Sequence, residues 1–214
     1  MQYIDLHSHI DTKADLTIVN LYPKNWDNSL PYYYSIGIHP WYIEKSCLSN
    51  DFEIINRALV DKNCLALGEC GLDKLTNTDF ELQKEVFLKQ LALAEKHQKP
   101  AIIHCVKAFD ELILIKKSHP NITMIIHGFS KSNALAKQLQ KHGFYLSFGK
   151  HILKHPEMLK DLDLTKIFLE TDDDAISIET IYAKVSTQLA ISLEVLQKQI
   201  TNNFTKIFKG EFFI

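Results

Sequence analysis

Cysteine and glycine are scarce in this chain of 214 residues. The four cysteines include no CxxC pair, and a disulfide framework is not expected in a chain of this length. The sequence also has no internal repeat, low-complexity tract or linker-like segment. These absences indicate a reduced, cytoplasmic protein that forms a single domain over residues 1–214.

Long apolar runs and a strong excess of charge are absent too. No apolar stretch approaches the roughly 18 residues that cross a bilayer, and no secretory signal is visible at the N-terminus. The formal charge is -2, which excludes a globally basic surface for gripping long nucleic acid. With 46% hydrophobic residues the chain can bury a substantial core. We expect a monomer with no membrane association and no obligate protein partner.

Eight short runs rich in β-branched and aromatic residues recur along the sequence. Most are nearly continuous in apolar residues, which is typical of strands covered on both faces. We expect strands at 3–7, 16–22, 32–39, 64–69, 101–105, 122–129, 144–149 and 166–172.

Segments with helical periodicity separate the later strands. The clearest is 79–98, where Thr78 stands three residues before Glu81, as in a capping box, and Pro100 ends the pattern. We expect helices at 52–62, 79–98, 108–117, 132–141, 152–162, 178–190 and 192–208.

This alternation predicts an α/β fold, a compact TIM-type (β/α)8 barrel. The connections 8–15 and 23–31 are too short for full helices, so we expect the first helices of the outer ring to be missing or shortened. A doubly wound open sheet is the structural alternative.

Polar residues gather at the expected carboxyl ends of the strands, where barrels of this class build their active sites. Burying carboxylates there without partners would cost on the order of several kcal/mol each, and a bound cation removes that cost. Imidazole and carboxylate ligands suit zinc, manganese or iron, and magnesium less obviously. The residues at these ends are His7, His9, His39, Glu69, His104, His127 and Asp172.

Five other histidines have a simpler explanation. His97, His119 and His142 stand near expected helix C-termini, where a cation complements the helix dipole. His151 and His155 are four residues apart on an expected helix with no carboxylate beside them, which favours an exposed helix face.

Several motifs span Ile4 to Asp172, in the order DLHSH, GIHP, GECGLD, a QxxxFxxQLxLA run from Gln83, PAIIHC, IIHGFS and LETD. This ordered set resembles the TatD family of metal-dependent hydrolases. The tail ITNNFTKIF is similar to the closing helix of the family, with Asn203 at its asparagine. DxHxH alone is a weak signal, whereas the ordered set is specific.

The resemblance implies two adjacent divalent metal ions, such as zinc, manganese or magnesium. His7, His9 and Asp172 would hold the first ion, His104 and His127 the second, and Glu69 would bridge them. Water between such ions becomes hydroxide near neutral pH. The expected catalytic residues are therefore Glu69 and Asp172, with Asp172 as the general base.

Two more residues are expected to contact substrate, and a third is a candidate for binding phosphate. His39 is not needed as a ligand in this scheme and would bind substrate or orient the site. Lys107 stands where the family commonly has an arginine and would hold a phosphate. Lys150 follows the seventh strand, where barrels often bind phosphate.

The chain departs from the family pattern beside this site. Asp173 and Asp174 replace the usual alanine and proline after LETD, and Lys74 replaces a frequent tyrosine. The added negative charge would repel a phosphate or recruit another cation. Asp5 is expected to position a ligand from below the metals.

Three functions follow from these residues. The first is hydrolysis of phosphodiesters, with DNA ends or a small phosphodiester as substrate. The second is hydrolysis of an amide, ester or lactone in a small molecule, which the near-neutral charge and the aspartate run favour. The third, a non-catalytic protein with a structural metal, fits poorly because structural sites rarely share a bridging carboxylate.

Overall fold

The computed structural model describes residues 2–12 and 14–208 and contains eight parallel strands. Their hydrogen-bonded order is β1 to β8, the same as their order in sequence, and the backbone after β8 pairs again with β1 at Ser8 and Asp172. This is the order of the predicted barrel. The doubly wound alternative is wrong, because its strand order would reverse at a switch point. The strands are β1 Ile4–Ser8, β2 Leu16–Leu21, β3 Tyr34–Ile36, β4 Cys64–Asp73, β5 Ala101–Val106, β6 Met124–Ile126, β7 Tyr145–Phe148 and β8 Ile167–Leu169.

The chain divides into two compact units by its contacts. Unit 1 contains the residues up to Val19 and from Ile126 onward, and unit 2 contains Asn20–Ile125. Both boundaries fall inside strands, since β2 and β6 each contribute residues to both units. The expectation of a single domain over 1–214 stays a prediction.

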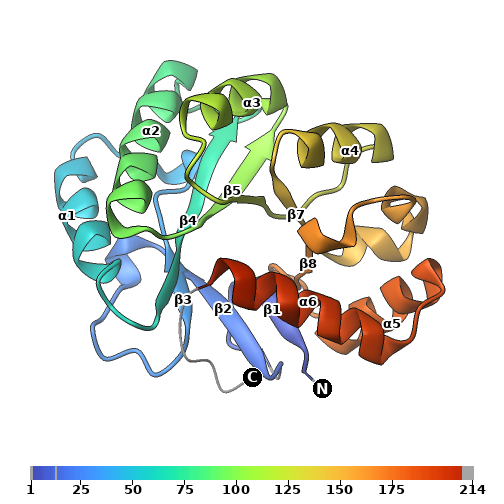
Figure 1. Ribbon diagram of the computed structural model, residues 1–214. Helices are drawn as coiled ribbons and strands as arrows, with labels where there is room; N and C mark the ends of the chain where they lie inside the picture. The colour runs from blue at the N-terminus through green and yellow to red at the C-terminus, as the bar shows by residue number, and fades with distance from the viewer. Residues whose placement is uncertain (1, 13, 209–214) are drawn as a thin grey trace. The chain divides into compact units, whose positions relative to one another are not determined.

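Unit 2 carries helices α1 Leu48–Ala58, α2 Phe80–His97 and α3 Phe109–Ser118 (Figure 1). α2 packs on β4 through buried apolar residues that include Phe87, Leu91 and Ala94. Two sequence expectations were wrong in detail. α1 begins four residues earlier than expected, and the N-cap of α2 is Asp79, which accepts the Leu82 N–H at 2.9 Å, rather than Thr78.

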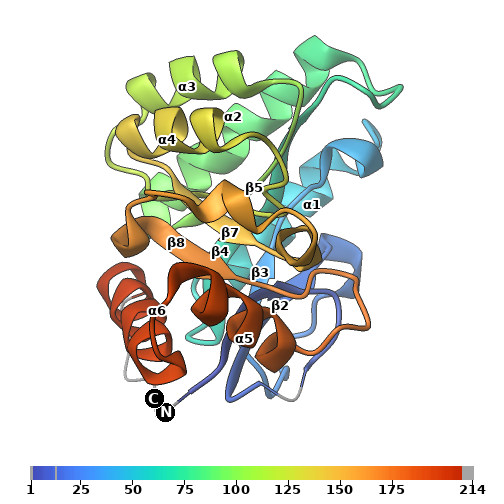
Figure 2. The ribbon, with the colours of Figure 1, turned by 90° about the vertical axis from the view of Figure 1, so that its right-hand side faces the viewer.

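Unit 1 carries helices α4 Asn133–Lys141, α5 Ile178–Leu189 and α6 Leu193–Ile207. Figure 2 shows α5 and α6, in orange and red, packed side by side. The helix expected at 152–162 was wrong: the structure has two 3₁₀ turns, η3 Lys150–Leu153 and η4 Pro156–Leu159, with η5 Leu164–Lys166 after them. Pro156 explains the break, because it has no N–H and its ring blocks the preceding helical turn.

The early part of the helical ring is shortened, as expected. Before α1, the described residues contain only two 3₁₀ turns, η1 Pro23–Asn25 and η2 Pro40–Tyr42. In the part of the chain that the structure describes, no helix is both long and apolar enough to reach across a bilayer. His97 ends α2, and His119 and His142 are the C-caps of α3 and α4, where the sequence placed them.

Candidate metal centre

Unit 1 brings four of the predicted ligands together, and we call them the first cluster: His7, His9, His127 and Asp172. Asp172 Oδ1 lies 3.6 Å from His7 Nε2 and 3.4 Å from His9 Nε2. The rings of His7 and His127 have centroids 4.3 Å apart. Ligand atoms of His7, His127 and Asp172 all lie within 4.8 Å of one another, a spacing that can hold a cation.

Backbone hydrogen bonds fix the first cluster. The Asp172 N–H donates to the His7 carbonyl at 2.9 Å, and the His9 N–H donates to the Asp172 carbonyl at 3.1 Å. The Ser8 hydroxyl also donates to the Asp172 carbonyl, at 3.2 Å. Asp172 adopts a left-handed conformation with φ 57°, which aspartate tolerates better than most residues. The chain thus turns sharply after β8 to place this carboxylate beside the end of β1.

Two further carboxylates contact residues of the first cluster or their neighbours. Asp5 accepts the Thr171 N–H at 2.9 Å and the Thr171 hydroxyl at 2.6 Å, so it positions the residue before Asp172. Burial raises the pKa of Asp5 to about 7, although the bonds from Thr171 oppose that shift. Glu170 is fully buried, lies 3.6 Å from His127 Nδ1 and accepts the Gly128 N–H. Glu170 was not predicted as a site residue. It is the first acid of LETD, and its place within an apolar strand pattern was the available signal.

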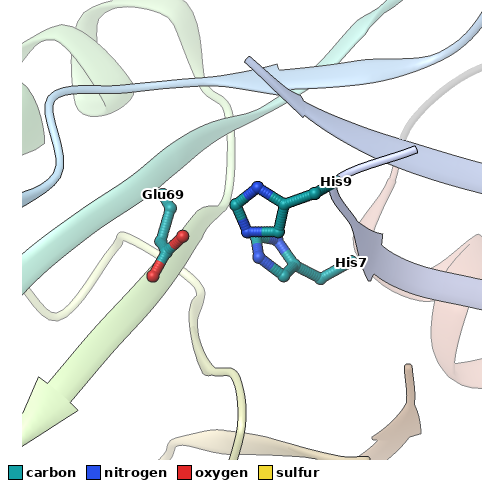
Figure 3. Close-up of side chains that lie close together, drawn as sticks. All are labelled: His7, His9 and Glu69. Carbon is teal, nitrogen blue, oxygen red and sulfur yellow. The ribbon is translucent and has the colours of Figure 1, made fainter. Parts of the chain in front are cut away.

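Unit 2 brings together His39, Glu69 and His104, which we call the second cluster. Glu69 Oε1 lies 3.0 Å from His39 Nε2 and 3.1 Å from His104 Nδ1. Figure 3 shows the carboxylate of Glu69, which comes from β4, and the rings of His7 and His9, which come from the end of β1. His39 and Glu69 are buried and His104 is nearly so.

The two nitrogens of His39 have different roles. Nδ1 accepts the Trp41 N–H at 3.1 Å, so in the neutral ring Nε2 carries the proton and donates it to Glu69. His39 is therefore placed to orient Glu69, and its ring also lies within ligand distance of Glu69 and His104. That His39 is not needed as a metal ligand stays a prediction.

Asn20, at the end of β2, holds Glu69 in place and was missed by the sequence reasoning. Its Oδ1 accepts the Glu69 N–H at 2.8 Å, and its Nδ2 donates to Glu69 Oε2 at 3.4 Å. Asn20 is buried in an otherwise apolar strand, and that polar interruption was the available signal. A buried amide in this position is satisfied only by such a partner.

Strand β4 runs further than expected. It passes through Glu69 and continues to Asp73, so Glu69 lies inside the strand and not at its end. The β4–β5 register shifts between Leu67 and Cys70. Gly71 has φ 146°, and a Cβ there would lie 2.0 Å from the His104 carbonyl oxygen, so only glycine lets β4 approach β5 this closely.

Asp73 holds the other side of His104. Its Oδ2 lies 3.3 Å from His104 Nε2 and accepts the Trp41 indole N–H at 2.6 Å. Burial alone would raise the pKa of Asp73, but the hydrogen bonds from Trp41, Leu75 and His104 outweigh it and leave that pKa below its usual range.

The remaining residues that the sequence singled out belong to neither cluster. Lys107 is exposed just before α3, with a left-handed φ of 53°. Lys150 pairs with Asp174, which balances part of the aspartate run's charge. Lys74 pairs with Glu111 at 2.5 Å and lies over the Phe80 ring.

The residues of both clusters suit a divalent ion. Imidazole nitrogens and carboxylate oxygens are ligands for zinc and manganese. Glu170 Oε2 is buried and accepts no hydrogen bond from any residue that the structure describes, as expected near a centre that gains positive charge.

Comparisons with known proteins agree with the motifs. The family model described as TatD related DNase matches residues 10–209. The YabD protein of Bacillus subtilis, called an uncharacterized metal-dependent hydrolase, is 32% identical over 149 residues, which cover 65% of this chain and 58% of that one. YjjV of Escherichia coli has the same description and is 31% identical, over 68% of this chain and 60% of its own length.

Solved structures show the same fold. The crystal structure of Escherichia coli YjjV, a TatD homolog, matches with a TM-score of 0.81 at 22% identity, covering 97% of this chain and 98% of that one. A TatD family hydrolase from Entamoeba histolytica matches with a TM-score of 0.76 at 14% identity, over 97% and 98% of the two chains. Since the family model matches nearly the whole sequence, the chain belongs to the TatD-related DNase family of metal-dependent hydrolases.

Proposed function

We propose that this protein is a metal-dependent hydrolase that cleaves phosphodiester bonds at DNA ends. The observation that carries the proposal is Glu69, a buried carboxylate that faces His104 and is oriented by both Asn20 and His39. Such support is typical of a metal ligand and not of a structural ion pair. The family's name supplies the substrate class.

The residues present divide the chemistry among them. Divalent ions held by the two clusters would acidify a bound water and balance charge on a phosphoryl transition state. His7, His9, His127 and Asp172 would be ligands in unit 1, and Glu69 and His104 in unit 2. Asp172, whose side chain is 36% exposed, reaches solvent and would accept the proton of the attacking water at its carboxylate. That Glu69 bridges two ions, as the resemblance implies, stays a prediction.

Lys107 is the proposed phosphate contact, because its exposed ammonium stands two residues before α3. As a point charge it would attract a phosphate without fixing its orientation. The pairing of Asp174 with Lys150 lessens the repulsion that the aspartate run would exert on such a substrate.

The test starts from metal-free protein. Magnesium, manganese or zinc is added back, and single-stranded DNA is assayed beside a panel of small esters and lactones. We expect DNA hydrolysis that falls by about 100-fold or more in Glu69→Gln and His127→Ala, since each removes a ligand. The matched control is His142→Ala, which changes a helix C-cap outside both clusters. Undiminished turnover in both ligand variants would contradict the proposal. If small esters or lactones are cleaved and DNA is not, the substrate is a small molecule and not DNA.

A further inference from the structure

A cavity of about 390 Å³ in unit 2 has His39 in its wall. The other walls come from the segments that follow β2 and β3 and from the start of α1. Its volume lies in the range of small-molecule sites. The lining residues used below are Tyr22, Lys24, His39, Tyr42, Glu44 and Asp51.

Two tyrosines give this cavity flat aromatic surface. The rings of Tyr22 and Tyr42 meet edge to face at 5.2 Å, and Tyr42 lies 5.5 Å from the His39 ring. Tyr42 is 54% exposed, so much of its ring area is open to a ligand. Aromatic faces of this kind stack on the planar rings of nucleobases.

The charged lining residues favour hydrogen-bond donors over phosphates. Glu44 and Asp51 both line the cavity, and burial, then the charge of Glu44, raises the pKa of Asp51. Two carboxylates accept hydrogen bonds from amino groups and repel anions, and Lys24 balances only one of them. A ligand here is therefore planar, not anionic, and equipped with N–H donors.

We propose that this cavity binds the nucleobase of the substrate's terminal nucleotide and prefers bases with an exocyclic amino group. His39 connects the cavity with the second cluster, because its ring lines the cavity while its Nε2 contacts Glu69. The inference rests on the proposed phosphodiester hydrolysis and adds a substrate preference to it.

The first experiment is independent of metal and of turnover. Metal-free protein is titrated with deoxycytidine, deoxyadenosine and thymidine by calorimetry. The alkylation rate of Cys47, a half-exposed cavity residue, is followed in parallel. We expect the two amino-bearing nucleosides to bind about tenfold more tightly than thymidine and to slow alkylation. Equal binding of all three, or no binding, overturns the proposal.

Variants locate the binding. Tyr42→Ala should weaken deoxycytidine binding roughly tenfold through lost stacking, whereas Tyr42→Phe keeps it. Asp51→Asn should remove the preference for amino-bearing bases. Glu53→Gln, on the exposed side of the same helix, is the matched control and should bind like wild type. Wild-type affinity in Tyr42→Ala overturns the proposal.

A kinetic comparison separates this inference from the proposed function. A DNA strand with a terminal deoxycytidine should be hydrolysed with a higher kcat/KM than the same strand with an abasic terminal residue. Equal rates contradict the base pocket while leaving phosphodiester hydrolysis intact. If neither strand is hydrolysed, the proposed function fails, and nucleoside binding still decides the cavity.

Discussion

Asn20 illustrates how much a single buried side chain contributes to this site. It bonds the backbone N–H and the carboxylate of Glu69, so it fixes both the residue and its rotamer. His39 and His104 contact the other carboxylate oxygen. Residues that orient a ligand in this way typically change metal affinity or activity by about 10- to 100-fold when removed.

Removing the Asn20 amide should therefore weaken metal binding and activity together. We expect Asn20→Ala to lower metal affinity by about 10- to 100-fold and to cost about 1–3 kcal/mol of stability, because the Glu69 N–H loses its acceptor. Metal titration and urea unfolding measure the two effects. Asn202→Ala, an exposed asparagine on α6, is the control. Unchanged metal affinity in Asn20→Ala would refute this role.

Tyr34 should make the protein sensitive to alkali. Its hydroxyl accepts the Trp26 indole N–H and donates to Asp61, each at 2.8 Å, and burial raises its pKa above the usual 10.0. Above pH 10 the unfolded chain loses this proton while the folded protein keeps it. The contribution of the protonated Tyr34 to the free energy of unfolding is therefore fully present below pH 10 and is lost as the pH rises.

Tyr34→Phe should remove up to about 1.4 kcal/mol per pH unit from that alkaline slope. Urea unfolding between pH 9 and 11 measures it. Tyr182, whose pKa burial also raises, keeps part of the slope in the variant. Tyr32→Phe controls for loss of a hydroxyl at a half-exposed neighbour. An identical slope in Tyr34→Phe and wild type would contradict the assignment.

At the scale of elements, α2 does more than cover the sheet. Gln90 bonds both the N–H and the carbonyl of Ile38, next to His39, at 2.7 and 3.1 Å. Gln83 does the same for Asp73, at 2.8 and 3.0 Å. The helix therefore positions two of the chain segments that contact the second cluster.

The start of α2 gives a test at this scale. Asp79 caps the helix through Leu82, so Asp79→Ala should cost about 1 kcal/mol of stability. Thr78→Ala, at the position that the sequence favoured as the cap, should cost less, because the Thr78 carbonyl that accepts from Gln83 survives the change. Denaturant midpoints compare the two. A larger loss in Thr78→Ala would restore the original expectation.

The sequence predicted most elements because local patterns determine them, and it failed where distant contacts decide. Periodicity located α2 and the eight strands. The extension of β4 beyond Glu69 depends on Gly68 and Gly71, where a side chain would collide with the backbone of β5. The local sequence pattern does not reveal this contact between the two strands. Asn20 and Glu170 were missed because their partners are distant in sequence. The partner of Asn20 is Glu69, about fifty residues later, and Glu170 accepts the N–H of Gly128, in the segment that follows β6. Pro156 was a local signal that the helical pattern outweighed.

At the scale of the molecule, the unit boundaries fall within strands. β2 and β6 supply residues to both units, so each unit contains only part of these two strands. We expect one cooperative thermal transition, with equal calorimetric and van't Hoff enthalpies. Two resolved transitions, or a calorimetric enthalpy well above the van't Hoff value, would show that the two units unfold separately.

The pairing of the Asp172 backbone with the end of β1 has a consequence during synthesis on the ribosome. His7 and His9 are made more than 160 residues before Asp172, which contacts both rings. His39, Glu69 and His104 are all made before His127 and Asp172. The nascent protein therefore carries every residue of the second cluster before the first cluster is complete, although the first cluster begins closer to the N-terminus.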